Sequence, residues 1–360
     1  MKISINSTVL KTALESTAKV ISPKASFPIL ANFHLKGDGS TLRIIGSDAS
    51  TTIIEEVPSD AEGSVCLPLS LLELVRTLPD DHIIIDTEDA SANIAWKNGH
   101  STIPAFDAKD YPVIKDAEGS PFIIPSDKFI SALNHTIPCV ADDEMRPAMN
   151  GVYFKVKEKD IDIVATDFHA LALVTIPTEE NSEQFDFIAQ PDALNAVRNS
   201  ARGIENIEIF HDENYCRFKV GNTTIITRKI VGKYPRYDSI IPTNFIASVK
   251  AGKKDIASSL KRVLVCSSKA SGHIKLSLNI LDSTFEAQDL GMGVMATEKP
   301  DGVTFDGSDL TIGFKGEYLL RAINALESED VEIKFTGAKS AAVVSSEADP
   351  CTILLMPVAI

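Results

Sequence analysis

The feature that most constrains this chain of 360 residues is an internal repeat. Three windows carry apolar residues at helical spacing, and a leucine takes the matching place in each of them: Leu14, Leu133 and Leu260. These leucines are 119 and 127 residues apart. A second set of helical windows lies at 69–78, 191–202 and 317–326, and its matching positions are 122 and 126 residues apart. Since two independent anchors give nearly the same period, the sequence predicts three copies of one domain of about 120 residues.

Each copy contains two helical windows and several stretches in which apolar and polar residues alternate. The alternation is clear at 82–86, 207–211 and 331–335, each directly after the second helical window of its copy. Two helices on antiparallel sheet make an α+β domain. Turn residues at 117–121 and 242–244 suggest boundaries, so we expect domains at 1–119, 120–244 and 245–360.

The chain is acidic, but the predicted helices are not. Fifty acidic residues against 35 basic ones give a net charge of −15, which by itself disfavours nucleic acid as a partner. The six helical windows (8–21, 69–78, 127–137, 191–202, 253–266 and 317–326) hold 11 basic and six acidic residues. The helices therefore carry +5 and the rest of the chain −20. Lysines on helix surfaces are common, so this excess alone does not establish a binding face.

The usual signatures of catalysis, cofactor binding and metal binding are missing. No phosphate-binding glycine loop or zinc-protease motif occurs, and the G-x-G-x-x-A string at 291–296 is followed by Lys-Pro-Asp-Gly instead of a helical pattern. Five widely separated cysteines and seven scattered histidines lack metal-ligand spacing, and the cysteines are expected to be buried thiols. We therefore expect no cofactor and no metal. With no membrane-length apolar run and no signal-peptide pattern, we expect a cytoplasmic protein without a membrane partner.

One pair of residues invites a catalytic interpretation. Asp167 and His169 are two positions apart, and on a strand they would share a face, so an Asp–His dyad is geometrically possible. A hydrolase using this dyad is the alternative function. A serine or cysteine nucleophile is not recognisable beside it, and no polar site recurs between the three copies.

Four strings resemble those of a known family: 146–151 (R-P-A-M-N-G), 165–172 (A-T-D-F-H-A-L-A), 233–242 (K-Y-P-R-Y-D-S-I-I-P) and the terminal 354–360 (L-L-M-P-V-A-I). Together with the triple repeat, they resemble the bacterial sliding clamps, the beta subunits of DNA polymerase III. The resemblance covers the whole chain. It implies a non-enzymatic head-to-tail homodimer that closes into a ring of six domains, with the helices lining the hole.

The resemblance also implies duplex DNA as a partner that is encircled without sequence specificity. Basic groups on the inner helices and loops would attract phosphate, while topology would give processivity. The candidate DNA contacts are Lys24, Arg146, Arg198, Arg202, Lys261 and Arg262. Asp192 stands where some relatives carry Lys.

A second site implied by the family is a pocket between the second and third domains, which takes short peptide motifs of the polymerase alpha subunit, the clamp loader and repair proteins. The matching residues are Met149, Thr166, His169, Leu171, Pro235, Ile240, Ala342, Leu354 and Met356. Phe168, Ala170 and Ser239 depart from the family, which has a small residue and two basic residues there. Phe168 is expected to narrow the pocket, and the two lost bases to weaken contacts with acidic peptide flanks.

Ring closure should join an edge of the first domain to an edge of the third. The expected contacts are Ile103 and Phe106 against Leu264 and Val265.

Overall fold

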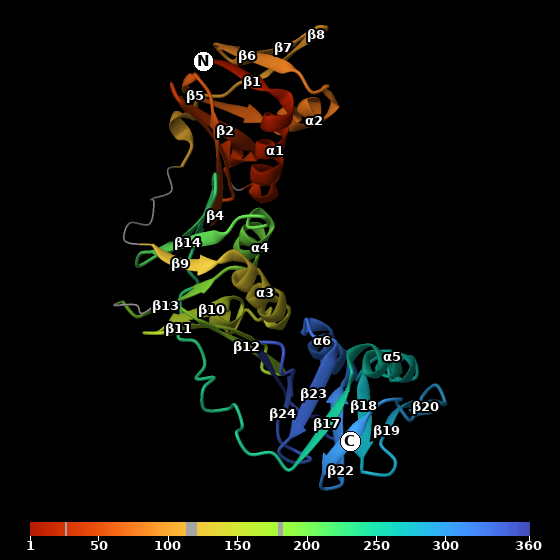
Figure 1. Ribbon diagram of the computed structural model, residues 1–360. Helices are drawn as coiled ribbons and strands as arrows, with labels where there is room; N and C mark the ends of the chain where they lie inside the picture. The colour runs from red at the N-terminus through yellow and green to blue at the C-terminus, as the bar shows by residue number, and fades with distance from the viewer. Residues whose placement is uncertain (26, 113–120, 179–182) are drawn as a thin grey trace. The chain divides into compact units, whose positions relative to one another are not determined.

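A computed structural model describes residues 1–25, 27–112, 121–178 and 183–360. The described residues form two compact units. The first comprises 1–130 with 192–229, and the second comprises 131–191 with 230–360. These units cut through the middle copy of the repeat because each contains a sheet that continues from one copy into the next (Figure 1).

The first unit holds two sheets and the helices α1 (Ser7–Thr17), α2 (Ser70–Thr77), the start of α3 (Ser126–Thr136) and nearly all of α4 (Pro191–Ser200). Its smaller sheet has the order β1 (Lys2–Asn6), β6 (His82–Glu88), β7 (Ser91–Trp96) and β8 (Gly99–Pro104). Its eight-stranded sheet runs β5 (Glu62–Pro68), β2 (Asn32–Asp38), β3 (Thr41–Ser47), β4 (Thr51–Pro58), β16 (Thr223–Arg228), β15 (Tyr215–Val220), β14 (Asn206–His211) and β9 (Phe122–Pro125).

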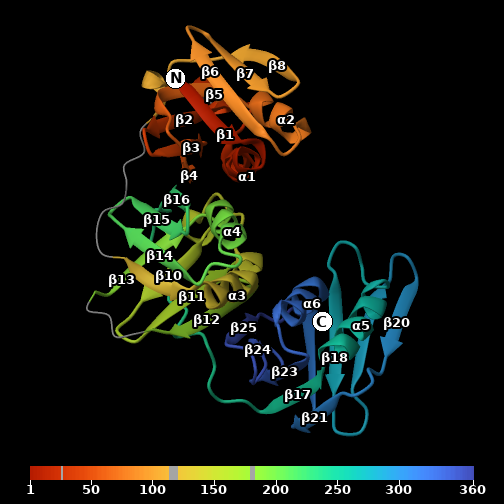
Figure 2. The same cartoon turned by 45° about the horizontal axis from the view of Figure 1, so that its top comes forward.

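The second unit has the same plan, with helices α5 (Lys253–Leu264) and α6 (Gly316–Ala325) side by side (Figure 2). Its nine-stranded sheet runs β13 (Phe185–Ala189), β10 (Val152–Val156), β11 (Asp160–Thr166), β12 (Ala170–Pro177), β25 (Cys351–Leu355), β24 (Ala342–Ser345), β23 (Asp330–Phe335), β17 (Ala247–Gly252) and β21 (Thr304–Gly307). Its smaller sheet has the order β20 (Val294–Glu298), β19 (Thr284–Asp289), β18 (His273–Leu278) and β22 (Leu310–Lys315).

The element order confirms the predicted triple repeat and its α+β class. All six predicted helices are present, and the strands expected at 82–86, 207–211 and 331–335 are β6, β14 and β23. The copies are joined by one rule: the fourth strand of a copy pairs antiparallel with the last strand of the next, as β4 with β16 and β12 with β25. The predicted turn at 242–244 lies outside helices and strands, whereas that at 117–121 lies outside the described residues up to position 120.

Helix α1 shows how the repeat forms its helices. Its buried positions include Leu10, Ala13, Leu14 and Thr17, the spacing that places one stripe against the sheet. The N-cap of this helix is Asn6 and not the adjacent Ser7. Asn6 accepts hydrogen bonds from the backbone N–H groups of Thr8 and Val9, because Ser7 is already helical and donates its hydroxyl to the Pro79 carbonyl.

As the sequence predicted, the G-x-G-x-x-A string at 291–296 does not lead into a helix. Gly291 lies in the turn after β19, and the string that begins there continues into strand β20, not into a helix. The cysteines are free thiols, four of them buried and Cys266 half-buried. Among the described residues, no helix is long and apolar enough to cross a membrane.

Candidate functional site

The string Thr166–Ala170 forms a tight turn between β11 and β12 in the second unit. The Asp167 carboxylate accepts hydrogen bonds from the backbone N–H groups of His169 (3.0 Å) and Ala170 (2.8 Å). The Thr166 hydroxyl donates to the Ala170 carbonyl at 2.8 Å. Phe168, at the tip, has a φ of 68°, in the left-handed region that favours glycine, so the turn is strained at this residue.

The turn does not form an Asp–His dyad, and the strand geometry assumed for the dyad is wrong. Asp167 and His169 lie in the turn and not on one strand. Asp167 Oδ1 serves the two backbone N–H groups, and Oδ2 lies 3.2 Å from the Arg321 guanidinium of α6. The nearby thiol of Cys139 is also no nucleophile, because burial raises its pKa to about 12.

His169 instead faces residues of the C-terminal repeat. Its ring meets Tyr318 of α6 edge-on at 5.4 Å between ring centres, and its carbonyl accepts the backbone N–H of Met356 at 2.9 Å. The Arg321 guanidinium lies 4.3 Å from the centre of the same Tyr318 ring. His169, Tyr318 and Met356 line a cavity of about 390 Å³, whose wall also includes Phe314 and Lys315.

The K-Y-P-R-Y string crosses the sheet as a strap that is fixed by its two tyrosines. Tyr234 stacks on Tyr153 of β10 at 4.6 Å between ring centres. Tyr237 donates its hydroxyl to Asp162 at 2.6 Å, and burial is the main reason that the pKa of this phenol is raised. Pro235 is thereby held half-buried between two anchored rings.

Leu171 and Leu354, both predicted pocket residues, lie opposite each other on β12 and β25 and share one buried apolar cluster. The cluster also contains Val343 of β24, which lies opposite Leu354. Ala342 is fully buried but lies opposite Leu355, so its side chain is on the other face of the sheet. The register therefore puts Val343 where the sequence suggested Ala342.

The other predicted pocket residues differ in exposure. Met149 is buried at the end of a short 3-10 turn, whereas Met356 and Ile240 are about half exposed. Thr166 is buried, and its hydroxyl belongs to the turn. Of the three residues that depart from the family pattern, Phe168 and Ser239 are exposed, whereas Ala170 is buried in the sheet.

A buried ion pair, missed by the sequence analysis, joins the middle and last copies of the repeat. His135 of α3 and Asp349 lie 3.1 Å apart, with side chains 0% and 1% exposed. Burial works against the charged form of His135, but Asp349 and the Ser131 carbonyl outweigh it and raise the pKa of His135. Burial likewise opposes the Asp349 carboxylate, yet His135 and two backbone N–H groups lower the pKa of Asp349. Cys351 completes a group of potential ligand atoms within 4.8 Å, although hydrogen bonds already use both imidazole nitrogens.

The predicted DNA contacts are all basic residues with exposed or half-exposed side chains, and some of them already have other neighbours. Arg262 of α5 is paired with Glu298, and its Nε donates at 2.9 Å. The Arg146 guanidinium lies over the Phe168 ring. Lys24, Arg202 and Lys261 are exposed, and Arg198 is half-buried in α4.

The predicted interface residues lie at or near two sheet edges. Strand β8 ends one four-stranded sheet and β20 ends the other. Ile103 of β8 is 9% exposed, and Phe106 just beyond it is 44% exposed. At the end of α5, Leu264 is half-buried and Val265 is 83% exposed. Of the four predicted interface residues, Phe106 and Val265 are thus the most exposed.

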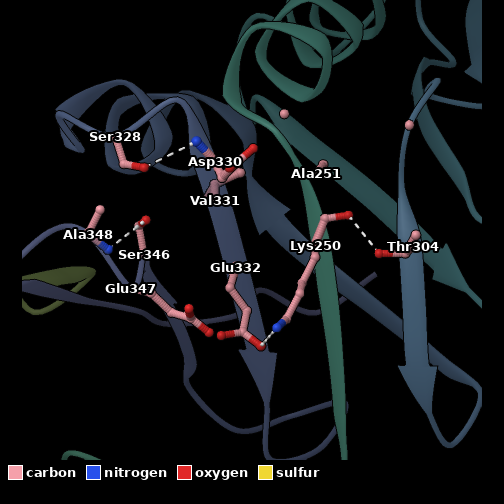
Figure 3. Close-up of a pocket in the computed structure, with 12 residues that line it drawn as sticks. Lys250, Ala251, Thr304, Ser328, Asp330, Val331, Glu332, Ser346, Glu347 and Ala348 are labelled. Atoms are coloured by element: carbon pink, nitrogen blue, oxygen red, sulfur yellow. Dashed lines mark hydrogen bonds and ion pairs between the residues drawn. The ribbon is translucent and has the colours of Figure 1, made fainter.

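A further pocket, in the last copy of the repeat, contains none of the predicted site residues (Figure 3). Its volume is about 510 Å³. Lys250 of β17 lies 3.6 Å from Glu332 of β23, and Glu347 approaches from the neighbouring loop. Its charged groups come mainly from the exposed sheet surface, and we assign it no ligand.

Comparison with known protein families gives three adjacent matches. The N-terminal domain of the DNA polymerase III beta subunit matches residues 1–115, its central domain matches 123–236, and its C-terminal domain matches 238–359. Among curated relatives, a "Beta sliding clamp" of Streptococcus pneumoniae serotype 4 is 30% identical over 356 residues, covering 93% of this chain and 92% of the relative. A "Beta sliding clamp" of Synechocystis is 28% identical and covers 99% of both chains.

Solved structures show the same fold. A sliding clamp from Pseudomonas aeruginosa bound to griselimycin superposes with a TM-score of 0.95 at 22% identity, over 100% of both chains. The DNA polymerase III beta chain of Streptococcus pneumoniae has a TM-score of 0.92 at 26% identity, also over 100% of both chains.

Proposed function

Because this chain belongs to the DNA polymerase III beta subunit family, we propose that it is a sliding clamp, two copies of which close head to tail around duplex DNA. In this role it tethers the replicative polymerase, and other replication and repair proteins, to the template. It is a non-catalytic subunit of the holoenzyme, and nothing supports the hydrolase alternative. A cytoplasmic location, with the chromosome, is part of this proposal.

The strand pairing between successive copies of the repeat is the main support for the proposal of a ring. The fourth strand of one copy pairs with the last strand of the next at both junctions within the chain, which leaves the last strand of the first copy and the fourth strand of the last copy, β8 and β20, at sheet ends. If a second chain obeys the same rule, its β20 pairs with β8 and its β8 with β20. A heterologous contact of this kind closes into a ring and leaves neither edge exposed.

DNA retention then depends on weak attraction and topology. The exposed bases Lys24, Arg202 and Lys261, with Arg198, are the phosphate contacts we propose for the inner surface. Arg262 contributes less because Glu298 already pairs with it. A modest positive potential of this kind holds phosphate without stopping movement along the duplex.

Partner peptides bind, in this proposal, where the strap, the Thr166–Ala170 turn and the C-terminal strand meet. Leu171, Leu354 and Val343 form the apolar floor, and His169 with Met356 forms the cavity beside it. Met149, Pro235 and Ile240 complete the site around the strap. A concave apolar surface with a few polar groups suits an extended peptide that inserts alternate side chains.

Retention on circular DNA tests the encircling function. Protein loaded by the host's own clamp loader onto a nicked plasmid should remain bound in about 0.5 M salt, which removes electrostatic binders, and should leave when a restriction enzyme linearises the plasmid. Native mass spectrometry of the same sample should give twice 38.9 kDa. Loss from the intact circle at that salt concentration, or equal retention on linear DNA, would contradict the proposal.

A further inference from the structure

A second concave site lies on the eight-stranded sheet of the first unit, where β4 of the first copy meets β16 of the second. Its volume is about 340 Å³. The register shows that its wall is one continuous face of five strands, because one cross-strand row runs Lys219, Thr224, Ile54, Ile45 and His34. Alternate residues of the same strands, such as Leu35 and Ile53, belong to the buried core.

This cavity is basic in an otherwise acidic protein. Four cationic side chains line it, Lys36, Arg43, Arg217 and Lys219, against one acid, Glu56. Glu56 pairs with Arg43 at 2.9 Å, and the Arg217 guanidinium lies 3.8 Å from the centre of the Phe210 ring, so Lys36 and Lys219 are the cations of the site on which the proposal rests. Burial and the charge of Lys36 lower the pKa of the neighbouring His34 to about 4, so this ring is neutral at physiological pH and adds no charge.

Two buried polar atoms of the site lack partners among the described residues. Tyr111, only 5% exposed, has a hydroxyl with no hydrogen-bond partner, and His34 Nδ1 also has none. The rings of these two residues lie 4.7 Å apart. A buried, unsatisfied hydroxyl is costly, and a carboxylate or carbonyl oxygen entering the cavity would satisfy it.

The repeat relates this cavity to the proposed peptide pocket. Tyr111-Pro112 follows β8 as Tyr234-Pro235 follows β16, and each tyrosine packs on the matching residue of a second strand, His34 of β2 or Tyr153 of β10. The cross-strand rows match as well, since His34 lies opposite Ile45 as Tyr153 lies opposite Val164.

The two sites differ mainly in charge. Arg217 lies opposite Ile226 at the position that Val343 takes opposite Leu354. Arg43 lies opposite Lys36 where Asp162 lies opposite Lys155. The cavity where β4 meets β16 thus has an aliphatic floor of Ile45, Ile54 and Ile226, and it has arginine at the positions where the proposed peptide pocket has valine and aspartate.

We propose that this cavity is a second docking site of the clamp, which binds a short acidic peptide segment of a partner protein. One apolar side chain of the segment lies on the isoleucine floor. Its carboxylates pair with Lys36 and Lys219, and one of its oxygens accepts the hydrogen bond of the Tyr111 hydroxyl. The charge complementarity favours an acidic peptide, while the apolar floor favours a peptide over a free phosphate or a nucleic-acid backbone.

Fluorescence anisotropy of the intact protein tests the site. The probe is a fluorescein-labelled peptide, Glu-Asp-Leu-Phe-Asp-Glu, compared with Gln-Asn-Leu-Phe-Asn-Gln and with Glu-Asp-Ser-Ser-Asp-Glu. We expect saturable binding of the first probe only. Lys36→Glu with Lys219→Glu should weaken it at least about tenfold, because two charge-assisted contacts are lost. The matched control, Lys97→Glu with Lys159→Glu, changes net charge equally at exposed turns outside the cavity and should leave affinity unchanged.

Tyr111→Phe distinguishes a loss of peptide affinity at the site from a loss of folding. It removes only the hydroxyl that lacks a partner, so thermal stability should stay the same or rise, while probe affinity falls about threefold. Met356→Ala, in the proposed peptide pocket, should not affect this probe. The proposal is overturned if both charge-reversal pairs weaken binding equally, if the peptide without acids or without the apolar pair binds as well, or if inorganic phosphate or oligo-dT displaces the probe as effectively as unlabelled peptide. None of these outcomes bears on retention of the ring on circular DNA.

Discussion

The guanidinium carbon of Arg146 lies 4.3 Å from the centre of the Phe168 ring, above the strained turn at the mouth of the proposed peptide pocket. The Asp143 carboxylate also lies near Arg146, 3.9 Å from its Nε. Arg146 thus belongs structurally to the pocket and not to a free basic surface. The ring that we expected to narrow the pocket is held in place by a cation that we expected to contact DNA.

Phe168→Gly should both stabilise the protein and open the pocket. Glycine adopts the φ of 68° without strain, which should contribute about 1 kcal/mol to the free energy of unfolding, less a smaller loss of the exposed cation–π contact. Removal of the ring should also strengthen binding of partner peptides several-fold. Urea denaturation and peptide anisotropy on the same preparation measure the two effects.

The repeat supplies a matched control for this change. Ala49 takes the same place in the turn between β3 and β4, with a φ of 76°, and Asp48 accepts backbone N–H groups there as Asp167 does. Ala49→Gly should therefore give a similar gain in stability with no change in peptide affinity. If Ala49→Gly also strengthens peptide binding, the effect of Phe168→Gly is not local to the pocket.

Arg146→Ala and Arg202→Ala should distinguish the proposed peptide pocket from the proposed DNA-binding surface. The first change frees the Phe168 ring and should alter peptide affinity two- to fivefold, about the worth of an exposed cation–π contact, while plasmid retention stays the same. The second removes an exposed base in the turn after α4 and should shorten retention on circular DNA at low salt without affecting peptide binding. If Arg146→Ala instead shortened retention on circular DNA and left peptide affinity unchanged, Arg146 would be a DNA contact.

The sequence predicted the repeated elements well because periodicity reports local structure. Both anchors of the repeat and all six helices are present in the structure. The register between distant strands could not be predicted from the sequence. Ala342 and Val343 are adjacent, equally apolar and both buried, and only the pairing with Leu354 and Leu355 decides which one faces the pocket.

Long-range polar contacts were equally hidden. His135 and Asp349 are 214 residues apart, and nothing in either local string marks the pair. Arg321 was counted among the helix cations, whereas its guanidinium is committed to Asp167 and to the Tyr318 ring. Charge counts along a chain cannot distinguish a free cation from one that is already paired.

The His135–Asp349 pair should make stability depend on pH. The folded pKa of His135 is raised, so its contribution is fully present below its unfolded pKa of about 6.5 and is lost as the pH rises through the folded value. The folded pKa of Asp349 is lowered, so its contribution is present above about pH 3.9 and is lost as the pH falls through the folded value. The pair thus stabilises most between about pH 4 and 6.5.

His135→Gln should remove the alkaline part of this dependence. It leaves Asp349 buried without its cation and should cost about 3–5 kcal/mol near pH 6, and less as the pH rises through the folded pKa of His135. Urea midpoints measured from pH 6 to 9 report the change. His82→Gln, at an exposed position on β6, serves as the control and should leave the profile intact. A variant profile parallel to that of the unmodified protein would show that His135 is not the titrating group.

Closure of the ring should depend on Phe106 and Val265, the exposed apolar residues beside β8 and at the end of α5. Either Phe106→Asp or Val265→Asp should raise the dimer dissociation constant about thirtyfold or more, as loss of an interface anchor does, without unfolding the monomer. In the proposed head-to-tail dimer we expect the two residues to face each other at both interfaces. Phe106→Lys combined with Val265→Asp in one chain should therefore restore part of the affinity through a Lys–Asp pair, and less so at high salt. If the two residues did not face each other across the interface, the double variant would instead be weaker than either single one. Sedimentation velocity over a concentration series distinguishes the two arrangements.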